Sequence, residues 1–161
     1  MPHLTDDMKR LVREQKLGFV ATVSPDGTPN LSPKGTVTVW DDGHLVFADI
    51  RSPNTVRNLR SNPAVEINVV DPVVRKGYRF KGTGRILTEG PLLDEILAFY
   101  EKQLEIARER INAVVLVAVE QARELVSPAY DRGLSEAEVR ARWERYWDTL
   151  RRGDTAAPAG D

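Results

Sequence analysis

The residues with the most evident chemical potential are Ser52, Asn54 and Thr55, which lie where an apolar run gives way to a short helical pattern. Ser52-Pro53 is a typical helix start, with serine at the N-cap and proline at the first helical position. The free amides of a helix start, together with about half a positive charge from the helix dipole, favour an anionic group. A helix of only about two turns is equally explained as a capped turn after a strand. The residues alone leave both interpretations open.

Other kinds of chemistry have little support in the composition. The 161-residue chain has no cysteine, which excludes disulfide and thiolate chemistry, and its histidines, His3 and His44, belong to no cluster with metal-ligand spacing, so we predict no metal site. The formal net charge of −1 gives no support to a nucleic-acid or acidic-membrane partner. No apolar run approaches the roughly 20 residues that span a bilayer, and no signal-peptide core is visible, so we expect a cytoplasmic protein.

The elements that must position these residues are mostly short strands joined by turns. Apolar-polar alternation, bounded by Pro, Gly, Asn and Asp, predicts six strands, at 18–23, 30–40, 44–49, 64–71, 78–90 and 113–119, the last able to continue through a bulge to 126. Capped helical patterns occupy 5–16, 52–60, 91–104 and 135–152. This order predicts a mainly β protein with flanking helices, an antiparallel barrel in one domain over residues 1–152, with a disordered tail at 153–161.

The strand at 78–90 has an unusual inner side. Gly82 and Gly84 alternate there with larger apolar residues, which predicts a sharp bend or a close approach to another element. Its other side is basic, through Arg79, Lys81 and Arg85. A solvated face and the rim of a cofactor or substrate site both explain that charge.

A family resemblance rests on the order and spacing of three segments: VATVSPDGTPNLSPKGTV (20–37), DDGHLVFADIRSPNTVRNLRSNPAVEI (41–67) and FKGTGRILTEGP (80–91). Together they resemble the pyridoxamine 5'-phosphate oxidase-like, FMN-binding split-barrel family, over roughly residues 5 to 130. The resemblance implies a six-stranded antiparallel split β-barrel. SPAYD (127–131), followed by a Trp-rich helix, resembles one bacterial branch of that family.

The resemblance also implies a cofactor site. The FMN phosphate would lie over Ser52, Asn54 and Thr55, and the edge of the flavin ring would follow the backbone of residues 32–36, where Gly35 permits close approach. Family positions that touch the cofactor also match Ala48 and Asp49. The implied cofactor-binding residues are therefore Ser32, Pro33, Lys34, Gly35, Thr36, Ala48, Asp49, Ser52, Asn54 and Thr55.

The charge that would balance a phosphate is the main departure from the family pattern. In many relatives basic residues match Asn54 and Thr55, which are neutral here. Lys34, best placed in the motif, would compensate, as could two nearby arginines, Arg51 and Arg57. Alternatively, Lys34 would lie near the pyrimidine end of the flavin, where a fixed positive charge stabilises the reduced form. The sequence does not decide between these two roles.

The function implied is that of a homodimeric FMN-dependent oxidoreductase, with the cofactor between two barrels and an unknown small-molecule substrate. Pyridoxamine 5'-phosphate oxidase activity itself is not implied, because SEAEVRARWERYWDTLRRG (135–153) does not match the Arg- and His-bearing C-terminal segment of those enzymes. Three alternatives stay open: an F420-dependent reductase, a non-enzymatic flavin- or haem-binding module, and a cofactor-free interaction protein. Haem is disfavoured because the chain has only two histidines that could bind its iron.

The last helix carries Trp143, Tyr146 and Trp147 at helical spacing. An aromatic stripe of this kind is more often used for packing or a dimer contact than for stacking on a flavin or substrate.

Overall fold

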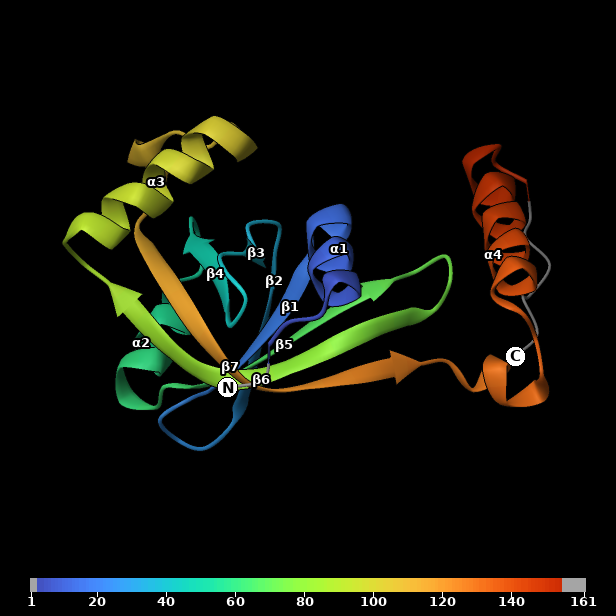
Figure 1. Ribbon diagram of the computed structural model, residues 1–161, viewed down its shortest axis with the longest axis horizontal. Coiled ribbons are helices and arrows are strands. Elements are labelled where there is room, and N and C mark those ends of the chain that lie inside the picture. Colours follow the sequence, from blue (N-terminus) through green and yellow to red (C-terminus); the bar gives the residue numbers. More distant parts are fainter. Residues whose placement is uncertain (1–2, 155–161) are drawn as a thin grey trace.

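A single seven-stranded antiparallel sheet curls into a half-barrel in the computed structural model, which describes residues 3–154 (Figure 1). The strands follow the spatial order β2-β1-β5-β6-β7-β4-β3, and every neighbouring pair is antiparallel. Their bounds are β1 (Gly18–Val23), β2 (Pro29–Lys34), β3 (Thr38–Val39), β4 (His44–Asp49), β5 (Ala64–Asp71), β6 (Lys76–Leu87) and β7 (Ala113–Val126). The mainly β, split-barrel architecture expected from the sequence is confirmed.

The strand count differs from the six expected because the segment predicted as one strand at 30–40 forms two. Its first half, β2, pairs with β1, whereas Thr38 and Val39 pair with β4 on the far side of the barrel. The chain between them joins the two edge strands of the sheet, so residues 35–37 leave one partner strand before they reach the other. We call this link, with Lys34 at its start and Thr36 within it, the mouth of the barrel.

The glycines of β6 mark the close approach that the sequence predicts. A Cβ atom added at Gly82 would overlap the carbonyl oxygen of Ala118 on β7, whereas one added at Gly84 would meet only side chains. The β6–β7 register shifts between Lys81 and Gly82, which is a bulge that bends both strands. The predicted continuation of β7 to Val126 is confirmed.

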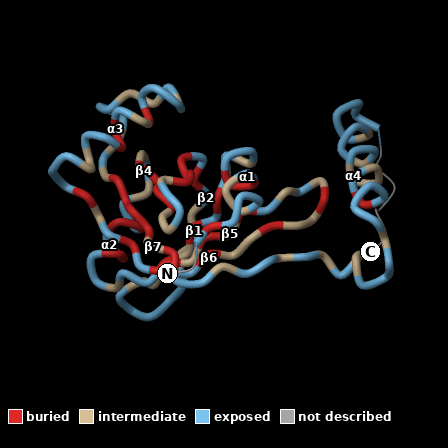
Figure 2. The backbone as a smooth tube through the Cα atoms, viewed as in Figure 1, coloured by how far each residue is buried: buried red, intermediate tan, exposed pale blue. Residues whose placement is uncertain are grey.

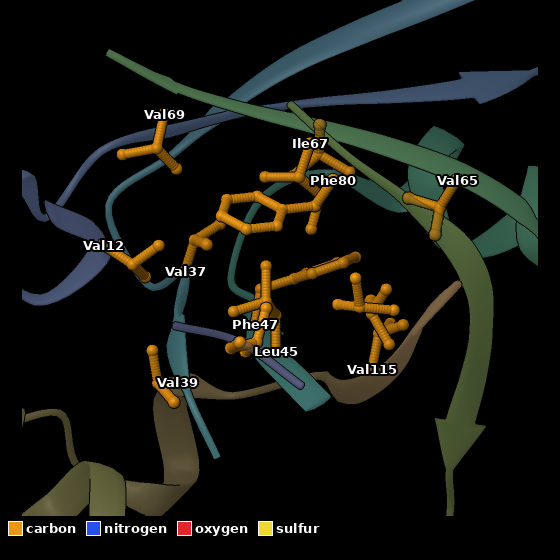
Figure 3. Packing of buried hydrophobic residues seen from close by; sticks show 14 of the residues in the cluster. Val12, Val37, Val39, Leu45, Phe47, Val65, Ile67, Val69, Phe80 and Val115 are labelled. Atoms are coloured by element: carbon orange, nitrogen blue, oxygen red, sulfur yellow. The ribbon is translucent and has the colours of Figure 1, made fainter. Parts of the chain in front are cut away.

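Two apolar clusters hold the fold together. The larger fills the barrel, where Phe47 and Phe80 are fully buried among aliphatic side chains from every strand except β2 (Figure 3). The second lies between β4, β7 and the helix α3 (Pro91–Leu104), around Ile96 and Tyr100. β4 therefore contacts apolar residues on both faces, which explains its continuous apolar run and its red tube in Figure 2.

The first two helices start where the sequence predicts. α1 (Asp6–Gln15) begins after Thr5, whose hydroxyl accepts a 3.3 Å hydrogen bond from the Met8 amide. α2 (Pro53–Ser61) follows Ser52 and ends before Asn62-Pro63. Leu11 and Val12 of α1 pack into the barrel core, so these short helices depend on tertiary packing for their stability.

The C-terminal helix α4 (Glu136–Arg151) extends away from the barrel at the end of β7 (Figure 1). Its predicted capping box is present between Ser135 and Glu138. It holds the tip of the β5–β6 hairpin, since the guanidinium carbon of Arg75 lies 3.5 Å from the Trp143 ring centroid. Gly153 continues the hydrogen bonding of the helix end. The rest of the tail predicted to be disordered, residues 155–161, lies outside the described residues.

Candidate functional site

The start of α2 is anchored by a carboxylate rather than by a serine cap. Ser52 occupies the N-cap position and Pro53 the first turn, as the sequence predicts, but the Ser52 side chain makes no capping hydrogen bond. Instead the Ser52 amide donates a 2.6 Å hydrogen bond to Asp49 Oδ1 at the end of β4. The Thr55 amide bonds the Ser52 carbonyl at 3.1 Å, and Pro53 has no amide hydrogen. Of the first-turn amides, that of Asn54 has no acceptor within the helix.

Lys34 is the buried cation of this region. Only 5% of its surface is exposed, and its ammonium group donates to Ser32 Oγ at 3.3 Å. Ser32 Oγ in turn lies 3.2 Å from Ser52 Oγ, so a chain of three polar groups connects the cation on β2 to the start of α2. Burial lowers the pKa of Lys34, and the negative charge of Asp49 opposes that shift.

Two further polar side chains lie one turn apart on the same face of α2. Thr55 and Asn58 are fully buried. The Asn58 amide donates to Thr22 Oγ1 at 3.1 Å, but Asn58 Oδ1 and Thr55 Oγ1 have no hydrogen-bond partner. Buried oxygens without a partner are rare in native proteins, so a donor from a water or a ligand is expected here. We call the set Thr22, Ser32, Lys34, Ser52, Thr55 and Asn58 the polar seam.

Asn58 was not among the residues predicted from the sequence. The signal that could have found it is the spacing of Ser52, Thr55 and Asn58, which places three small polar residues on one helix face where an amphipathic helix would carry apolar ones. Thr55 lies on that buried face, whereas Asn54 is exposed and its Oδ1 accepts a 3.0 Å hydrogen bond from Arg57. Of the three residues predicted to lie under the phosphate, Ser52 and Thr55 therefore belong to the polar seam, whereas Asn54 faces solvent.

Two of the predicted residues have structural partners that fix the mouth of the barrel. Thr36 Oγ1 donates to the Ala48 carbonyl at 2.8 Å and accepts from the Ala48 amide at 3.1 Å. The buried Tyr100 hydroxyl donates to the Thr36 carbonyl at 2.9 Å. The Ala48 side chain belongs to the apolar cluster under α3, so Ala48 and Thr36 position the neighbouring strand ends.

The remaining predicted features lie apart from the polar seam. Pro33 and Gly35 are exposed on either side of Lys34. Arg79 and Lys81 both pair with Glu66, at 2.9 and 3.3 Å, on the outer face of the sheet, which supports the solvated-face interpretation. No group of three or more His, Asp or Glu residues within residues 3–154 could hold a metal ion. None of the helices described is long and apolar enough to cross a membrane.

Chemically, the polar seam is equipped to bind an anion. It combines a buried ammonium group, two hydroxyls that can turn their hydrogens toward a ligand, and the positive end of a helix with an unpaired amide. Binding and orientation of a ligand are therefore what these residues can supply.

Comparison with known proteins places this arrangement in a family. Residues 4–126 match the family described as Pyridoxamine 5'-phosphate oxidase. The chain belongs to this family. It is 33% identical to HupZ of Group A Streptococcus, whose crystal structure superposes with a TM-score of 0.68 over 76% of this chain and 94% of that one. It is also 30% identical, over 73% of its length and 78% of the relative's, to an uncharacterized protein of Methanocaldococcus jannaschii.

Two solved structures of lower sequence identity show the same fold. An FMN-binding protein of Syntrophomonas wolfei is 14% identical and superposes with a TM-score of 0.64 over 77% of this chain and 87% of that one. A protein described as F420 reductase is 24% identical, with a TM-score of 0.58 over 74% of this chain and 98% of that one. The half-barrel thus occurs in proteins whose names refer to two different flavin-type cofactors.

Proposed function

We propose that this protein is an FMN-binding oxidoreductase that holds the cofactor phosphate at the polar seam. The observation that carries the proposal is the chain from the Lys34 ammonium group through Ser32 Oγ to Ser52 Oγ at the start of α2. A structural lysine would reach solvent or an acidic partner, but Lys34 is buried and has no ion pair within 4.0 Å among the described residues. An anion held at the helix start would supply the missing partner.

The residues present fit a phosphate group. The Asn54 amide and the hydroxyls of Ser32 and Ser52 provide donors, and Lys34 provides the charge. Charge-assisted hydrogen bonds of this kind contribute about 1.5–3 kcal/mol each. Arg57, already tethered to Asn54 on the exposed side, can add a second positive charge from solvent. Thr55 would need to rotate its enclosed hydroxyl to contribute.

When bound, FMN supplies hydride or electron transfer at its N5 atom. The chain's own part is to bind and orient the cofactor and to limit access of water. Gly35, exposed beside Lys34, leaves space for a flat ring along the backbone. A cation held near the pyrimidine end of that ring would stabilise the negative charge of the reduced state. The substrate of the proposed reaction is an unidentified small molecule.

We also propose that two copies pair, with the cofactor between them. The outer side of β1 and β2 exposes large apolar side chains, since Phe19 is 42% and Leu31 63% exposed. Phe19 pairs with Pro33 and Ala21 with Leu31, so these residues form one apolar strip on the sheet edge that ends beside Lys34. Exposed apolar patches of this kind mark interfaces. A cytoplasmic location and the absence of nucleic-acid and membrane partners stay predictions from the sequence.

The pairing is tested by the mass of the protein in solution. Leu31→Glu should convert a dimer into a monomer in light scattering coupled to size-exclusion chromatography, because it places a charge in the apolar strip. Leu150→Glu, at another exposed leucine (42%) on α4 and away from the apolar strip, serves as the control. A wild-type protein that runs as a monomer would contradict the proposed pairing.

F420 is the second candidate cofactor, because the half-barrel also occurs in a protein described as F420 reductase. Mass analysis and the absorption spectrum of ligand released from the purified protein separate the two, with bands near ~450 nm for FMN and ~420 nm for F420. FMN uptake is then measured by flavin fluorescence. Ser52→Ala should weaken FMN binding about tenfold or more, whereas Ser61→Ala at the other end of α2 should not. A protein that takes up no FMN would refute the proposal.

A further inference from the structure

A second feature of the barrel mouth is a groove of about 360 Å³ between α1, α3 and the chain that links β2 to β3. In Figure 1, β3 and this link lie between α1 and α3. The volume is within the range of about 300–1,000 Å³ that small-molecule sites occupy. We call it the α1–α3 groove; its lining residues are Val12, Arg13, Lys16, Gly35, Val37, Thr38, Val39, Trp40, Phe99, Gln103 and Leu104.

Most of the α1–α3 groove is apolar. The rings of Trp40 and Phe99 meet edge to face with their centroids 6.0 Å apart. Val39 and Leu104 extend this surface along β3 and α3. A surface of aromatic and branched side chains binds hydrocarbon or a flat ring through the apolar area that it removes from water.

The polar part of the α1–α3 groove is positively charged. Arg13 and Lys16 lie at its rim, and no acidic residue lines it. Neither cation forms an ion pair with any residue in the described range 3–154. Both lie at the C-terminal end of α1, where the helix carbonyls are negative, so an anion there would be recognised by these side chains and not by the backbone. A ligand with a carboxylate and an apolar body matches this arrangement.

Another large cavity, of about 390 Å³ between α1, the β5–β6 hairpin and α4, differs in this respect. Both its lysine and Arg10 are already paired, Lys76 with Glu136 at 3.0 Å and Arg10 with Asp7 at 2.6 Å, and its remaining lining includes the acidic residues Asp71 and Glu124. The Tyr78 hydroxyl also donates to Asp7 at 2.6 Å. Few charges there are left for a ligand.

We propose that the α1–α3 groove binds the substrate as an apolar molecule with a carboxylate group. The substrate role depends on the proposed function, because the groove shares Gly35 with the backbone segment assigned to the edge of the flavin ring. A molecule whose body lies on Trp40 and Phe99, with its carboxylate toward Arg13 and Lys16, would lie beside that ring.

Trp40 provides the test, because it is one of three tryptophans and lines the groove. In a protein with Trp143→Phe and Trp147→Phe, Trp40 fluorescence reports binding of two probes of equal chain length, decanoate and decanol. We expect decanoate to bind about three- to thirty-fold more tightly, since two exposed ion pairs favour it. Arg13→Gln with Lys16→Gln should remove this preference.

Lys102→Gln, which neutralises an exposed lysine on α3 outside the groove, is the matched control and should retain the preference. Equal affinity for the two probes, or no change in Trp40 emission, would overturn the proposal.

In the FMN-loaded protein, decanoate should also shift the flavin absorption band, and an unmoved band would overturn the substrate role. FMN uptake is measured separately. A protein that binds FMN but not decanoate would therefore contradict only the proposal for the α1–α3 groove. A protein that takes up no flavin contradicts the proposed function.

Discussion

Replacement of Lys34 by methionine should change stability and FMN affinity in opposite directions. Methionine has a similar length and no charge, so it keeps most of the packing of a side chain that is only 5% exposed. If Lys34 serves only the fold, its replacement should lower the stability of the protein. If Lys34 instead binds an anionic ligand, its replacement should lower the affinity for that ligand.

The expected magnitudes follow from the contacts of Lys34. Without ligand, its ammonium group has one hydrogen bond, of 3.3 Å to Ser32, and lies 5.4 Å from the centroid of the Phe47 ring. These contacts offset only part of the cost of burying a charge, so Lys34→Met should be as stable as the wild type or up to about 2 kcal/mol more stable. FMN binding should weaken by about 1.5–3 kcal/mol, or roughly 10- to 150-fold.

The pH dependence of stability gives an independent check. The pKa of Lys34 is lowered in the folded protein from its ordinary value of 10.5 because of burial. Between the folded and unfolded pKa values the unfolded chain binds the extra proton, so the free energy of unfolding rises with pH in that window. The destabilising contribution of Lys34 is fully present below its folded pKa. The stability difference between Lys34→Met and the wild type should therefore shrink as pH rises toward 10.5.

Urea denaturation of the ligand-free proteins measures the stability change, and quenching of flavin fluorescence measures the affinity. Lys81→Met, at an exposed strand lysine paired with Glu66, is the control and should leave FMN affinity unchanged. A lower flavin potential with little loss of affinity would assign Lys34 to the ring instead of the phosphate. A Lys34→Met protein that is clearly less stable but binds FMN normally would refute the reasoning.

Three other predictions concern the frame around the site. Gly82→Ala should lower the free energy of unfolding by 3 kcal/mol or more, because its methyl group would overlap a backbone carbonyl of β7, whereas Gly84→Ala, which meets only side chains, should cost about 1–3 kcal/mol in urea denaturation. Trp143→Leu should speed proteolysis of α4 without changing FMN affinity, since it removes a contact with Arg75 worth about 0.5–2 kcal/mol. Tyr100→Phe should cost about 1 kcal/mol in the same denaturation assay, because it removes a buried hydrogen bond at the barrel mouth.

The sequence predicted the fold where a local pattern decides the structure. Thr5 and Ser135 cap helices because each hydroxyl accepts a hydrogen bond from the amide three residues further along the chain, a contact that local sequence decides. The split of residues 30–40 into β2 and β3 could not be predicted in this way. Both halves alternate as strands do, and only the distant partners, β1 and β4, determine where one pairing ends and the other begins.

The candidate site shows the same limit. Sequence patterns and the family resemblance selected Lys34, Ser32 and Ser52, and the fold brings these three side chains into contact. They could not show that the Ser52 side chain makes no capping bond while the Ser52 amide donates to Asp49, because that depends on where β4 ends relative to α2. Nor did they find Asn58. Its side-chain oxygen is notable because it is buried without a hydrogen-bond partner, and that depends on how α2 packs.

The distribution of unsatisfied polar atoms argues that the seam is more than a structural joint. Among the described residues, the buried side-chain oxygens without a partner belong to Thr55, Asn58 and Asn68. Two of these three lie one turn apart on α2, and Ser52 at the start of that helix connects through Ser32 to the buried Lys34. Each unpaired oxygen costs about 1–3 kcal/mol, and apolar residues at 55 and 58 would avoid that cost while still packing α2 on β1. A helix face that keeps hydroxyl and amide groups at this cost is explained most simply if the Thr55 hydroxyl donates to a bound ligand and a water molecule donates to Asn58 Oδ1.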